Sequence, residues 1–421
     1  MSSCSGNREL LKTVNLDITS SKVFENGFTG LAIYDPGAKK WVYEYNSKKY
    51  FIPASNTKLF TFYTGLQVLG DSVPAIRYTI NNDSLIFTGT GDPSLLHKDL
   101  PESSVIDFLK HSDKNLFFMP AIYSESGLGP GWAWDDYNYY YSAEKSSLPV
   151  AGNTVIFSFK NAESIPEAYP KIFSDSTLLD KTKSERSGVK RDRHQNIFRY
   201  TVNPEKTDSE RSVPFNTSEA LAIKILEDSL QRNIEILHND PDVNLEKTFY
   251  SIPTDSLYKR LLQQSDNFIA EQILLLAANQ ISDSLKTQIA IDHMKENFLK
   301  DLPQEPKWVD GSGLSRYNLQ TPGNMVRLLE KILKEVPQDR LFELLPAGGV
   351  SGTLKSQFKN EQPFIYAKTG SLSNNYSLSG YLITKKGKLL IISFMNSNYM
   401  VPSSALKAEM EKIIENIRNL K

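Results

Sequence analysis

Three short patterns of serine, lysine and asparagine could together carry out acyl transfer. Ser55 and Lys58 frame an S-x-x-K tetrad, Ser265 and Asn267 an S-x-N triad, and Lys368 opens the sequence K-T-G. A serine hydroxyl can attack a carbonyl when a nearby amine takes its proton, so these residue types suit a covalent acyl-enzyme. Each pattern alone is weak evidence for an active site, because S-x-x-K occurs six times in the chain and S-x-N three times. Their conjunction in this order, with K-T-G present once, indicates an active site.

The first pattern fits the start of an amphipathic helix. Residues 53–55 (PAS) precede an apolar stripe at helical spacing, which ends at Gly70. Free N–H groups at a helix start favour negative charge that develops near Ser55. Lys58 lies one turn further on the same face, so its amine can reach the Ser55 hydroxyl. A lysine with its ordinary pKa of about 10.4 is a poor base at neutral pH, so burial and a second cation must lower it, and Lys368 is the candidate for that cation.

The other two patterns suggest the remaining roles. Ser265 lies at a junction with helical sequence on both sides, and it could relay a proton between the tetrad lysine and a leaving amine. The side-chain amide of Asn267 could hold a peptide group of the substrate. The K-T-G strand would offer an edge along which an extended peptide pairs, with Gly370 allowing close backbone approach. The backbone N–H groups of Ser55 and Ser371 would then form an oxyanion hole.

The composition is that of an ordinary globular protein. Its 421 residues favour two or three domains, and 40% hydrophobic residues supply a sizeable core. A formal charge of −1 gives no overall attraction to nucleic acid or to an anionic membrane. One cysteine, Cys4, and five scattered histidines remove disulfides and most metal sites from consideration, which favours serine and lysine chemistry.

The two ends of the chain share a pattern that the middle lacks. Residues 28–46 predict a hairpin. Residues 364–396 predict three strands, followed by a helix over 403–420. Between about 74 and 251 short strands alternate with turns, and helices resume after Ser256. We expect one sheet made from the terminal hairpins, with the middle of the chain inserted.

With these motifs the sequence resembles a known family, the low-molecular-mass penicillin-binding proteins of class C, which are D-alanyl-D-alanine carboxypeptidases and endopeptidases. The 210 residues from Ser55 to Ser265 match the long insertion of that family, and a further 103 lead to Lys368, whereas compact serine beta-lactamases have a far shorter first interval. The resemblance covers about residues 28–398. The segments that carry it, besides the three motifs, are residues 89–95 (GTGDPSL), 131–136 (GWAWDD), 265–271 (SDNFIAE), 310–316 (DGSGLSR) and 367–372 (AKTGSL).

The resemblance implies a reaction and a substrate. Ser55 would attack the carbonyl of the penultimate D-Ala of a peptidoglycan stem peptide, release the terminal D-Ala, and be freed by hydrolysis of the acyl-enzyme. Some relatives also cut the cross-bridge between D-Ala and diaminopimelate, and the balance of the two activities is left open. Beta-lactams mimic the D-Ala-D-Ala end and are expected to acylate the same serine. No metal or organic cofactor is implied.

The resemblance also implies how the carboxyl end of the substrate is bound. The hydroxyls of Thr369 and Ser371 would bind the terminal carboxylate. Residues 311–313 (GSG) are expected to form a tight turn rather than a catalytic element, because the spacing of a G-x-S-x-G nucleophile elbow is not met.

In the same family an acidic residue and an arginine bind the free end of the diaminopimelate side chain. The matching positions here are Asp136 and Arg316, with Trp134 and Tyr141 beside the acid. Asp135 could replace Asp136. Packing of the aromatic rings and capping of a turn are the alternative roles of this segment.

A peptidoglycan enzyme acts outside the cytoplasm, so we expect this protein in the periplasm or cell envelope. The chain has no secretory hydrophobic region, and we expect that a leader has been replaced ahead of residue 2. Residues 2–4 (SSC) fit the end of a bacterial lipoprotein leader, in which Cys4 would become the lipidated residue that anchors the protein to the membrane. The alternative is a stray exposed cysteine.

The expected fold is α+β. Residues 1–75 plus 250–421 would form a discontinuous beta-lactamase/transpeptidase-like catalytic domain, an antiparallel sheet flanked by helices. Residues 76–249 would form a strand-rich inserted domain, which could consist of two subdomains. Within it, the basic run 181–193 is expected to be a solvated or mobile loop, with a binding patch as the alternative.

Two other functions remain compatible with the motifs. A serine beta-lactamase or esterase on the same scaffold would turn over penicillin rapidly, and the long first interval argues against it. A non-hydrolytic beta-lactam sensor or wall-binding protein would form a stable adduct without releasing D-Ala, and the presence of all three motifs argues against it.

Overall fold

The computed structural model describes residues 2–160, 165–181, 187–202, 209–237 and 243–420. Contacts within the chain group it into two compact units. The first comprises Met1–Gln67, Tyr258–Asp266 and Ile291–Lys421, and the second comprises Val68–Leu257 and Asn267–Ala290. Residues 267–290 therefore belong to the second unit, whereas the domain bounds predicted from the sequence place them in the catalytic domain. The division into folding domains stays a prediction.

The first unit is built around one antiparallel sheet. Its strands are β1 (Phe28–Asp35), β2 (Lys40–Tyr45), β16 (Ile365–Leu372), β17 (Asn375–Ile383) and β18 (Leu389–Ser397). Their order is β16-β17-β18-β1-β2, and the register pairs Gly30 with Met395 across the junction of the two ends of the chain. The single sheet predicted from the terminal hairpins is confirmed.

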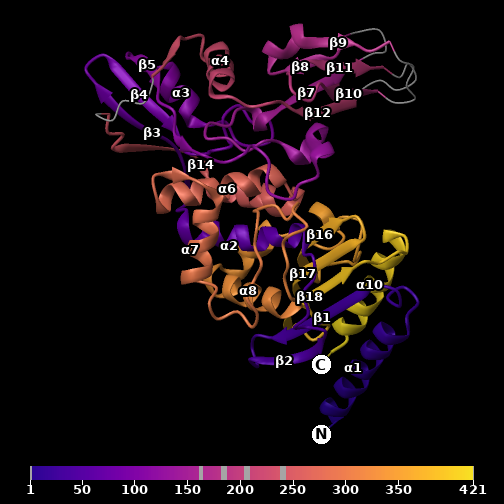
Figure 1. Cartoon of the computed structure of the whole chain (residues 1–421). Coiled ribbons are helices and arrows are strands. Elements are labelled where there is room, and N and C mark those ends of the chain that lie inside the picture. Colours follow the sequence, from indigo (N-terminus) through magenta and orange to yellow (C-terminus); the bar gives the residue numbers. More distant parts are fainter. Residues whose placement is uncertain (1, 161–164, 182–186, 203–208, 238–242, 421) are drawn as a thin grey trace. The chain divides into compact units, whose positions relative to one another are not determined.

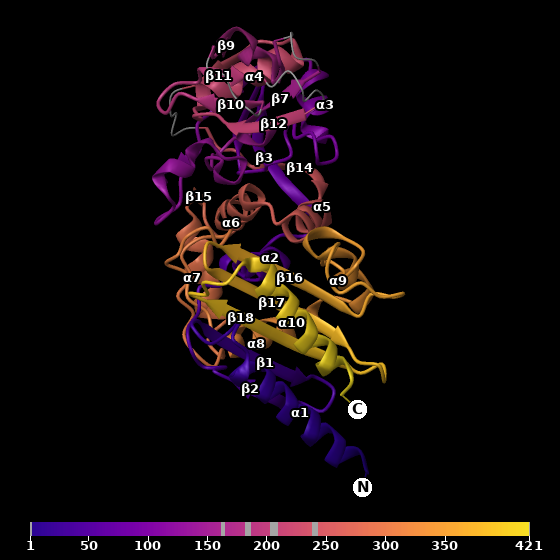
Figure 2. The ribbon, with the colours of Figure 1, turned by 90° about the vertical axis from the view of Figure 1, so that its right-hand side faces the viewer.

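Helices cover both faces of this sheet. α1 (Ser2–Ser20) and α10 (Ser403–Arg418) pack on one face, and α8 (Pro322–Glu335) packs on the other (Figures 1 and 2). Side chains alternate between the faces, so Phe394 joins the α1 and α10 cluster, while the Tyr381 hydroxyl donates to the Leu329 carbonyl of α8 at 2.8 Å. Burial on both faces explains why β18 is a continuous apolar run. α1 is not predicted from the sequence.

The element that carries Ser55 begins as a 3-10 helix, η1 (Ala54–Thr57), and continues as α2 (Lys58–Val68). The predicted helix is confirmed, but burial extends beyond the predicted apolar stripe to the other faces of the helix. All eight residues from 58 to 65 are buried, so the first turns of α2 are enclosed on every side.

Ser265 lies between two helical segments, as predicted. α5 (Thr254–Lys259) continues into one π-helical turn, η6 (Arg260–Gln264), and α6 (Asn267–Ile281) follows. Ser265 has a φ of 58°, in the left-handed region, so the chain changes direction there. The other helices after α6 are α7 (Thr287–Asn297), α9 (Gln338–Leu344) and the 3-10 turn η7 (Gly352–Leu354). Within the described ranges, none of the helices combines the length and apolarity needed to cross a bilayer.

The second unit is rich in strands. Their bounds are β3 (Ser72–Asn81), β4 (Ser84–Gly89), β5 (Asn115–Phe118), β6 (Ile122–Tyr123), β7 (Thr154–Phe159), β8 (Glu167–Tyr169), β9 (Thr177–Leu179), β10 (Gly188–Arg191), β11 (Phe198–Thr201), β12 (Ser209–Pro214), β13 (Ile234–Ile236), β14 (Lys247–Pro253) and β15 (Ser284–Leu285). They form sheets of order β13-β5-β4-β3-β14, β12-β7-β8, β10-β11-β9 and β15-β6. One apolar cluster contains Phe87 of β4, Phe157 of β7 and Phe198 of β11, so the three larger sheets share a core.

Short helical segments complete this unit. They are α3 (Ser104–Lys110), α4 (Glu219–Leu230) and the 3-10 turns η2 (Trp134–Asn138), η3 (Tyr140–Ser142), η4 (Ala151–Asn153) and η5 (Lys171–Ser176). Of the basic run 181–193, residues 182–186 lie outside the described residues. Arg191 is 2% exposed, and its Nε donates to the Pro214 carbonyl at 2.7 Å. The expectation of a solvated loop is therefore wrong for Arg191, which ties β10 to β12.

Replacing Phe394 by Ala tests the core beneath the sheet. The Phe394 ring is fully buried and lies 5.9 Å from the ring of Phe24. Removing it should lower the free energy of unfolding of the first unit by about 3–5 kcal/mol, because a cavity is left. Phe28→Ala is the matched control, since Phe28 on β1 is 65% exposed. Urea unfolding followed by circular dichroism measures both changes, and equal losses would contradict this layering.

Candidate active site

Ser55 and Lys58 meet directly in the first unit. The Lys58 amine donates to Ser55 Oγ at 3.0 Å across the passage from η1 to α2. Lys58 is fully buried, whereas Ser55 is half-buried. When the amine is neutral, the hydroxyl can donate to it over the same contact. The pair has the geometry of a nucleophile and its general base.

Lys368 and Ser265 form a second pair. The Lys368 amine donates to Ser265 Oγ at 2.8 Å and to the carbonyl of Thr369 at 2.7 Å. Burial holds the pKa of Lys368 well below the usual value for lysine, and the charge of Lys58 lowers it further. That repulsion requires the two amines to lie near one another, so the fold brings Ser55, Lys58, Ser265 and Lys368 into one cluster.

The K-T-G strand lies directly against the start of η1. A Cβ placed on Gly370 would come 2.4 Å from the Pro53 carbonyl oxygen and 2.9 Å from the Ser55 backbone nitrogen, so only glycine fits this contact. Asn56, which the sequence analysis misses, donates from Nδ2 to the Lys368 carbonyl at 3.0 Å. The side-chain amide therefore holds β16 beside the nucleophile.

Thr369 and Ser371 differ in their surroundings. Thr369 is buried, and its hydroxyl donates to the Thr353 hydroxyl oxygen at 2.7 Å, while Ser371 is exposed. Thr353 is a second residue that the sequence analysis misses. The only sequence signal is its place directly after Gly352 in a glycine-rich segment, which does not indicate a contact with the K-T-G strand.

Residues 311–313 make the tight turn expected from the sequence, with Gly313 at a φ of 78°. The turn also reaches the site, because the Ser312 carbonyl accepts a hydrogen bond from the Lys58 amine at 2.7 Å. This contact is not predicted from the sequence. The contribution of the turn is a backbone carbonyl, so side-chain patterns could not reveal it.

The second unit holds Asn267 and the aromatic segment. Asn267 opens α6, and its Nδ2 donates to the Tyr141 carbonyl at 2.9 Å. The Tyr141 hydroxyl donates to Asp136 Oδ1 at 3.0 Å, and burial together with this acceptor raises the pKa of Tyr141. A chain of two hydrogen bonds thus links the S-x-N motif to Asp136.

The remaining predicted residues lie at the surface. Trp134 is 65% exposed and its ring lies 4.7 Å from the Arg193 guanidinium, so the ring is at the surface and not in the core. Asp135 and Arg316 are exposed, and the Arg316 guanidinium lies 3.3 Å from the Ser373 carbonyl. The side chain of Cys4 lies outside the described residues.

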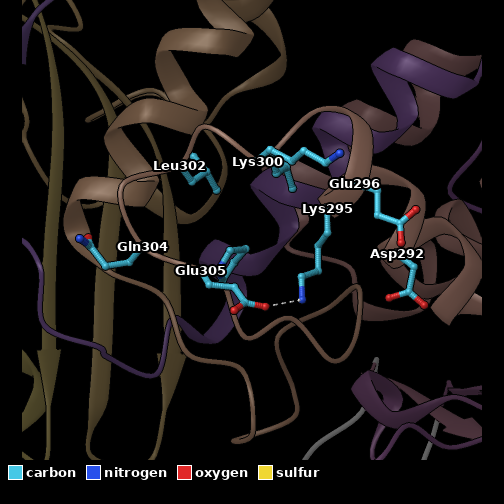
Figure 3. Close-up of a pocket in the computed structure, with 9 residues that line it drawn as sticks. Asp292, Lys295, Glu296, Lys300, Leu302, Gln304 and Glu305 are labelled. Carbon is cyan, nitrogen blue, oxygen red and sulfur yellow. Dashed lines mark hydrogen bonds and ion pairs between the residues drawn. The ribbon is translucent and has the colours of Figure 1, made fainter.

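A hollow at the C-terminal end of α7 is lined by residues of the first unit (Figure 3). Lys295 and Glu305 face one another there at 3.1 Å, with the carboxylates of Asp292 and Glu296 nearby. The lining has mixed charge and includes none of the predicted site residues.

The fold is that of the beta-lactamase/transpeptidase-like class, as predicted. The chain belongs to the D-Ala-D-Ala carboxypeptidase 3 (S13) family, whose model matches residues 13–420. It is 25% identical over 450 aligned residues to the D-alanyl-D-alanine carboxypeptidase DacB of Haemophilus influenzae. The alignment covers 97% of this chain and 93% of that protein.

Two solved structures show the same fold over nearly the whole length. Penicillin binding protein 4 (dacB) from Haemophilus influenzae matches with a TM-score of 0.74 and 21% identity, over 97% of this chain and 98% of that one. Its complex with a beta-lactam matches with a TM-score of 0.68 and 20% identity over the same shares of the two chains.

The lowered pKa of Lys368 predicts how stability depends on pH. Between that lowered pKa and the ordinary value of 10.5, the unfolded chain binds more protons than the folded one, so stability rises with pH. Lys368→Met removes this dependence. The melting temperature of the wild type relative to Lys368→Met should therefore rise as pH is raised from 7 toward about 10. Lys386→Met, at an exposed lysine after β17, is the control, and the same slope for both variants would contradict the assignment.

Proposed function

We propose that the protein is a serine-type D-Ala-D-Ala carboxypeptidase that hydrolyses peptidoglycan stem peptides through an acyl-enzyme on Ser55. The observation that carries this proposal is the pair of buried amines, one 3.0 Å from the Ser55 hydroxyl and one 2.8 Å from the Ser265 hydroxyl. Membership of the D-Ala-D-Ala carboxypeptidase family and the name of the Haemophilus relative support the substrate class.

Acylation starts when Lys58 takes the Ser55 proton and Oγ attacks the carbonyl carbon of the penultimate D-Ala. Repulsion between the two buried amines disfavours a second proton on the pair, so the pair loses a proton more readily than an ordinary lysine does. The backbone N–H groups of Ser55 and Ser371 stabilise the oxyanion. Ser265 passes a proton to the amine of the departing D-Ala, and water then hydrolyses the ester.

The substrate peptide extends along β16, which is an outer strand of its sheet. Gly370 lets this strand lie directly against the start of η1, because a Cβ there would meet the Pro53 carbonyl oxygen. The hydroxyls of Thr369 and Ser371 bind the terminal carboxylate of the substrate, and the Asn267 amide binds a peptide group.

The diaminopimelate side chain of the substrate ends in one ammonium and one carboxylate. Asp136, which accepts the Tyr141 hydroxyl, suits the ammonium, and Arg316 suits the carboxylate. The exposed ring of Trp134 can cover the aliphatic part of the same side chain.

The substrate places the enzyme outside the cytoplasm, in the periplasm or the cell envelope. Lipidation of Cys4 is the anchor that the SSC sequence suggests. Mass spectrometry of the native protein tests it, because an unmodified Cys4 would rule the anchor out.

Beta-lactams should acylate Ser55, because they mimic the D-Ala-D-Ala end. Ser55→Ala should abolish labelling by a fluorescent penicillin, and Lys58→Ala and Lys368→Ala should each slow labelling by roughly 100-fold or more. Gel fluorescence after timed incubation measures the labelling. Persistent labelling of Ser55→Ala would overturn the choice of nucleophile, and rapid release of hydrolysed penicillin by the wild type would point to a beta-lactamase.

Incubation with two substrates distinguishes the activities of the family. We expect D-Ala release from a purified stem pentapeptide, measured by mass spectrometry of the products. Cleavage of a cross-linked dimer in the same assay would add endopeptidase activity. A stable penicillin adduct without cleavage of either substrate would instead support a sensor or wall-binding protein.

A further inference from the structure

A backbone carbonyl holds the amine of Lys58. The 2.7 Å contact from Nζ to the Ser312 carbonyl is shorter than the 3.0 Å contact to Ser55 Oγ. A neutral amine has two N–H groups and one lone pair. Placing one N–H on a fixed carbonyl restricts rotation of the amino group about the Cε–Nζ bond. The carbonyl therefore helps to set the direction of the lone pair that must receive the Ser55 proton.

The carboxylate of Asp310 shapes the turn that presents this carbonyl. Asp310 is 1% exposed, and its Oδ1 accepts the Gly313 N–H at 2.8 Å while its Oδ2 accepts the Ser315 N–H at 2.7 Å. Asn318 Nδ2 adds a third hydrogen bond to Oδ1 at 2.7 Å. Hydrogen bonds to a buried carboxylate are strong, so the backbone path over residues 310–315 is narrowly defined.

The turn is also attached to the helix that carries Lys58. The hydroxyl of Thr61, one turn further along α2, donates to the Gly311 carbonyl at 2.6 Å. Trp308 Nε1 donates to the Asp310 carbonyl at 2.7 Å, and the Trp308 ring lies 5.4 Å from the Phe60 ring on the same helix. The base and the carbonyl that holds it are thus fixed to one helix.

Gly313 brings the turn against the residue before the nucleophile. A Cβ at this position would lie 1.9 Å from the Ala54 carbonyl oxygen, so the backbones are in direct contact. A shift of the turn would therefore change the surroundings of both Ser55 and Lys58.

We propose that Thr61 and Asp310 are positioning residues for the general base: they hold the turn so that the Ser312 carbonyl directs the Lys58 amine at the Ser55 hydroxyl. This inference rests on the proposed function, in which Lys58 takes the Ser55 proton. Neither residue touches the reacting atoms, and both act through the Ser312 carbonyl.

Thr61→Val tests the attachment to the helix, because valine keeps the shape of the side chain and removes the hydroxyl. The acylation rate constant at saturating fluorescent penicillin should fall by roughly tenfold, since small displacements of a catalytic group are costly. The half-saturating concentration and the fraction of chains that become labelled should not change. Rapid-quench measurements over a range of penicillin concentrations separate these quantities.

Thr64→Val is the matched control. Thr64 is also fully buried on α2, but its hydroxyl donates within the helix, to the Phe60 carbonyl at 2.9 Å. We expect Thr64→Val to acylate at the wild-type rate and Thr61→Ser, which restores the hydroxyl, to recover it. Asp310→Asn replaces the oxygen that accepts the Ser315 N–H by an amide donor, so this variant should also acylate more slowly. It tests the same positioning role if Thr61→Val does not fold.

An unchanged acylation rate in Thr61→Val, equal losses in Thr61→Val and Thr64→Val, or a loss confined to the half-saturating concentration would each overturn the inference. Lys58→Ala and Ser55→Ala in the same assay keep the two proposals apart. Full acylation of either variant would defeat the proposed function. A slow Lys58→Ala beside a normal Thr61→Val would defeat only the positioning role.

Discussion

The amines of Lys58 and Lys368 are buried near one another, and the surrounding structure of the first unit supplies the hydrogen bonds that this burial requires. Burial of an ammonium group is costly unless hydrogen bonds replace its water. Each amine has a serine hydroxyl and a backbone carbonyl among its partners: Ser55 and Ser312 for Lys58, and Ser265 and Thr369 for Lys368. Burial and repulsion hold the pKa of Lys368 well below its usual range. The site therefore favours the neutral form of a lysine amine more than water does, at a cost in folding stability.

This arrangement depends on close contact between backbone segments far apart in the sequence. β16 reaches η1 at Gly370, and the turn over residues 310–315 reaches it at Gly313, where a Cβ would overlap a carbonyl oxygen. Asn56 and Thr61 add side-chain hydrogen bonds to these two segments. Rigid placement of this kind suits acyl transfer, because the rate of proton transfer falls steeply when a base is displaced.

The second unit connects the S-x-N motif to the residues proposed for substrate recognition. Asn267 binds the Tyr141 carbonyl, and the Tyr141 hydroxyl binds Asp136. The other end of this segment is attached to β10, where the Arg191 N–H donates to Asn138 Oδ1 at 2.7 Å. Asn267 is proposed to bind a peptide group of the substrate, so the binding of the substrate side chain at Asp136 would depend on the same residue.

The sequence by itself determined the parts of this protein that depend on short-range patterns. Lys58 follows Ser55 by three positions, which is about one helical turn. The apolar runs at the two ends of the chain predict the strands of the single sheet. Only the tertiary structure decided that α2 is enclosed on all sides and that Thr353 meets the K-T-G strand. It also brought the Ser312 carbonyl, 254 positions further along the chain, within hydrogen-bond distance of the Lys58 amine. The physical reason is that a backbone carbonyl is the same in every residue, so its role depends on where packing places it.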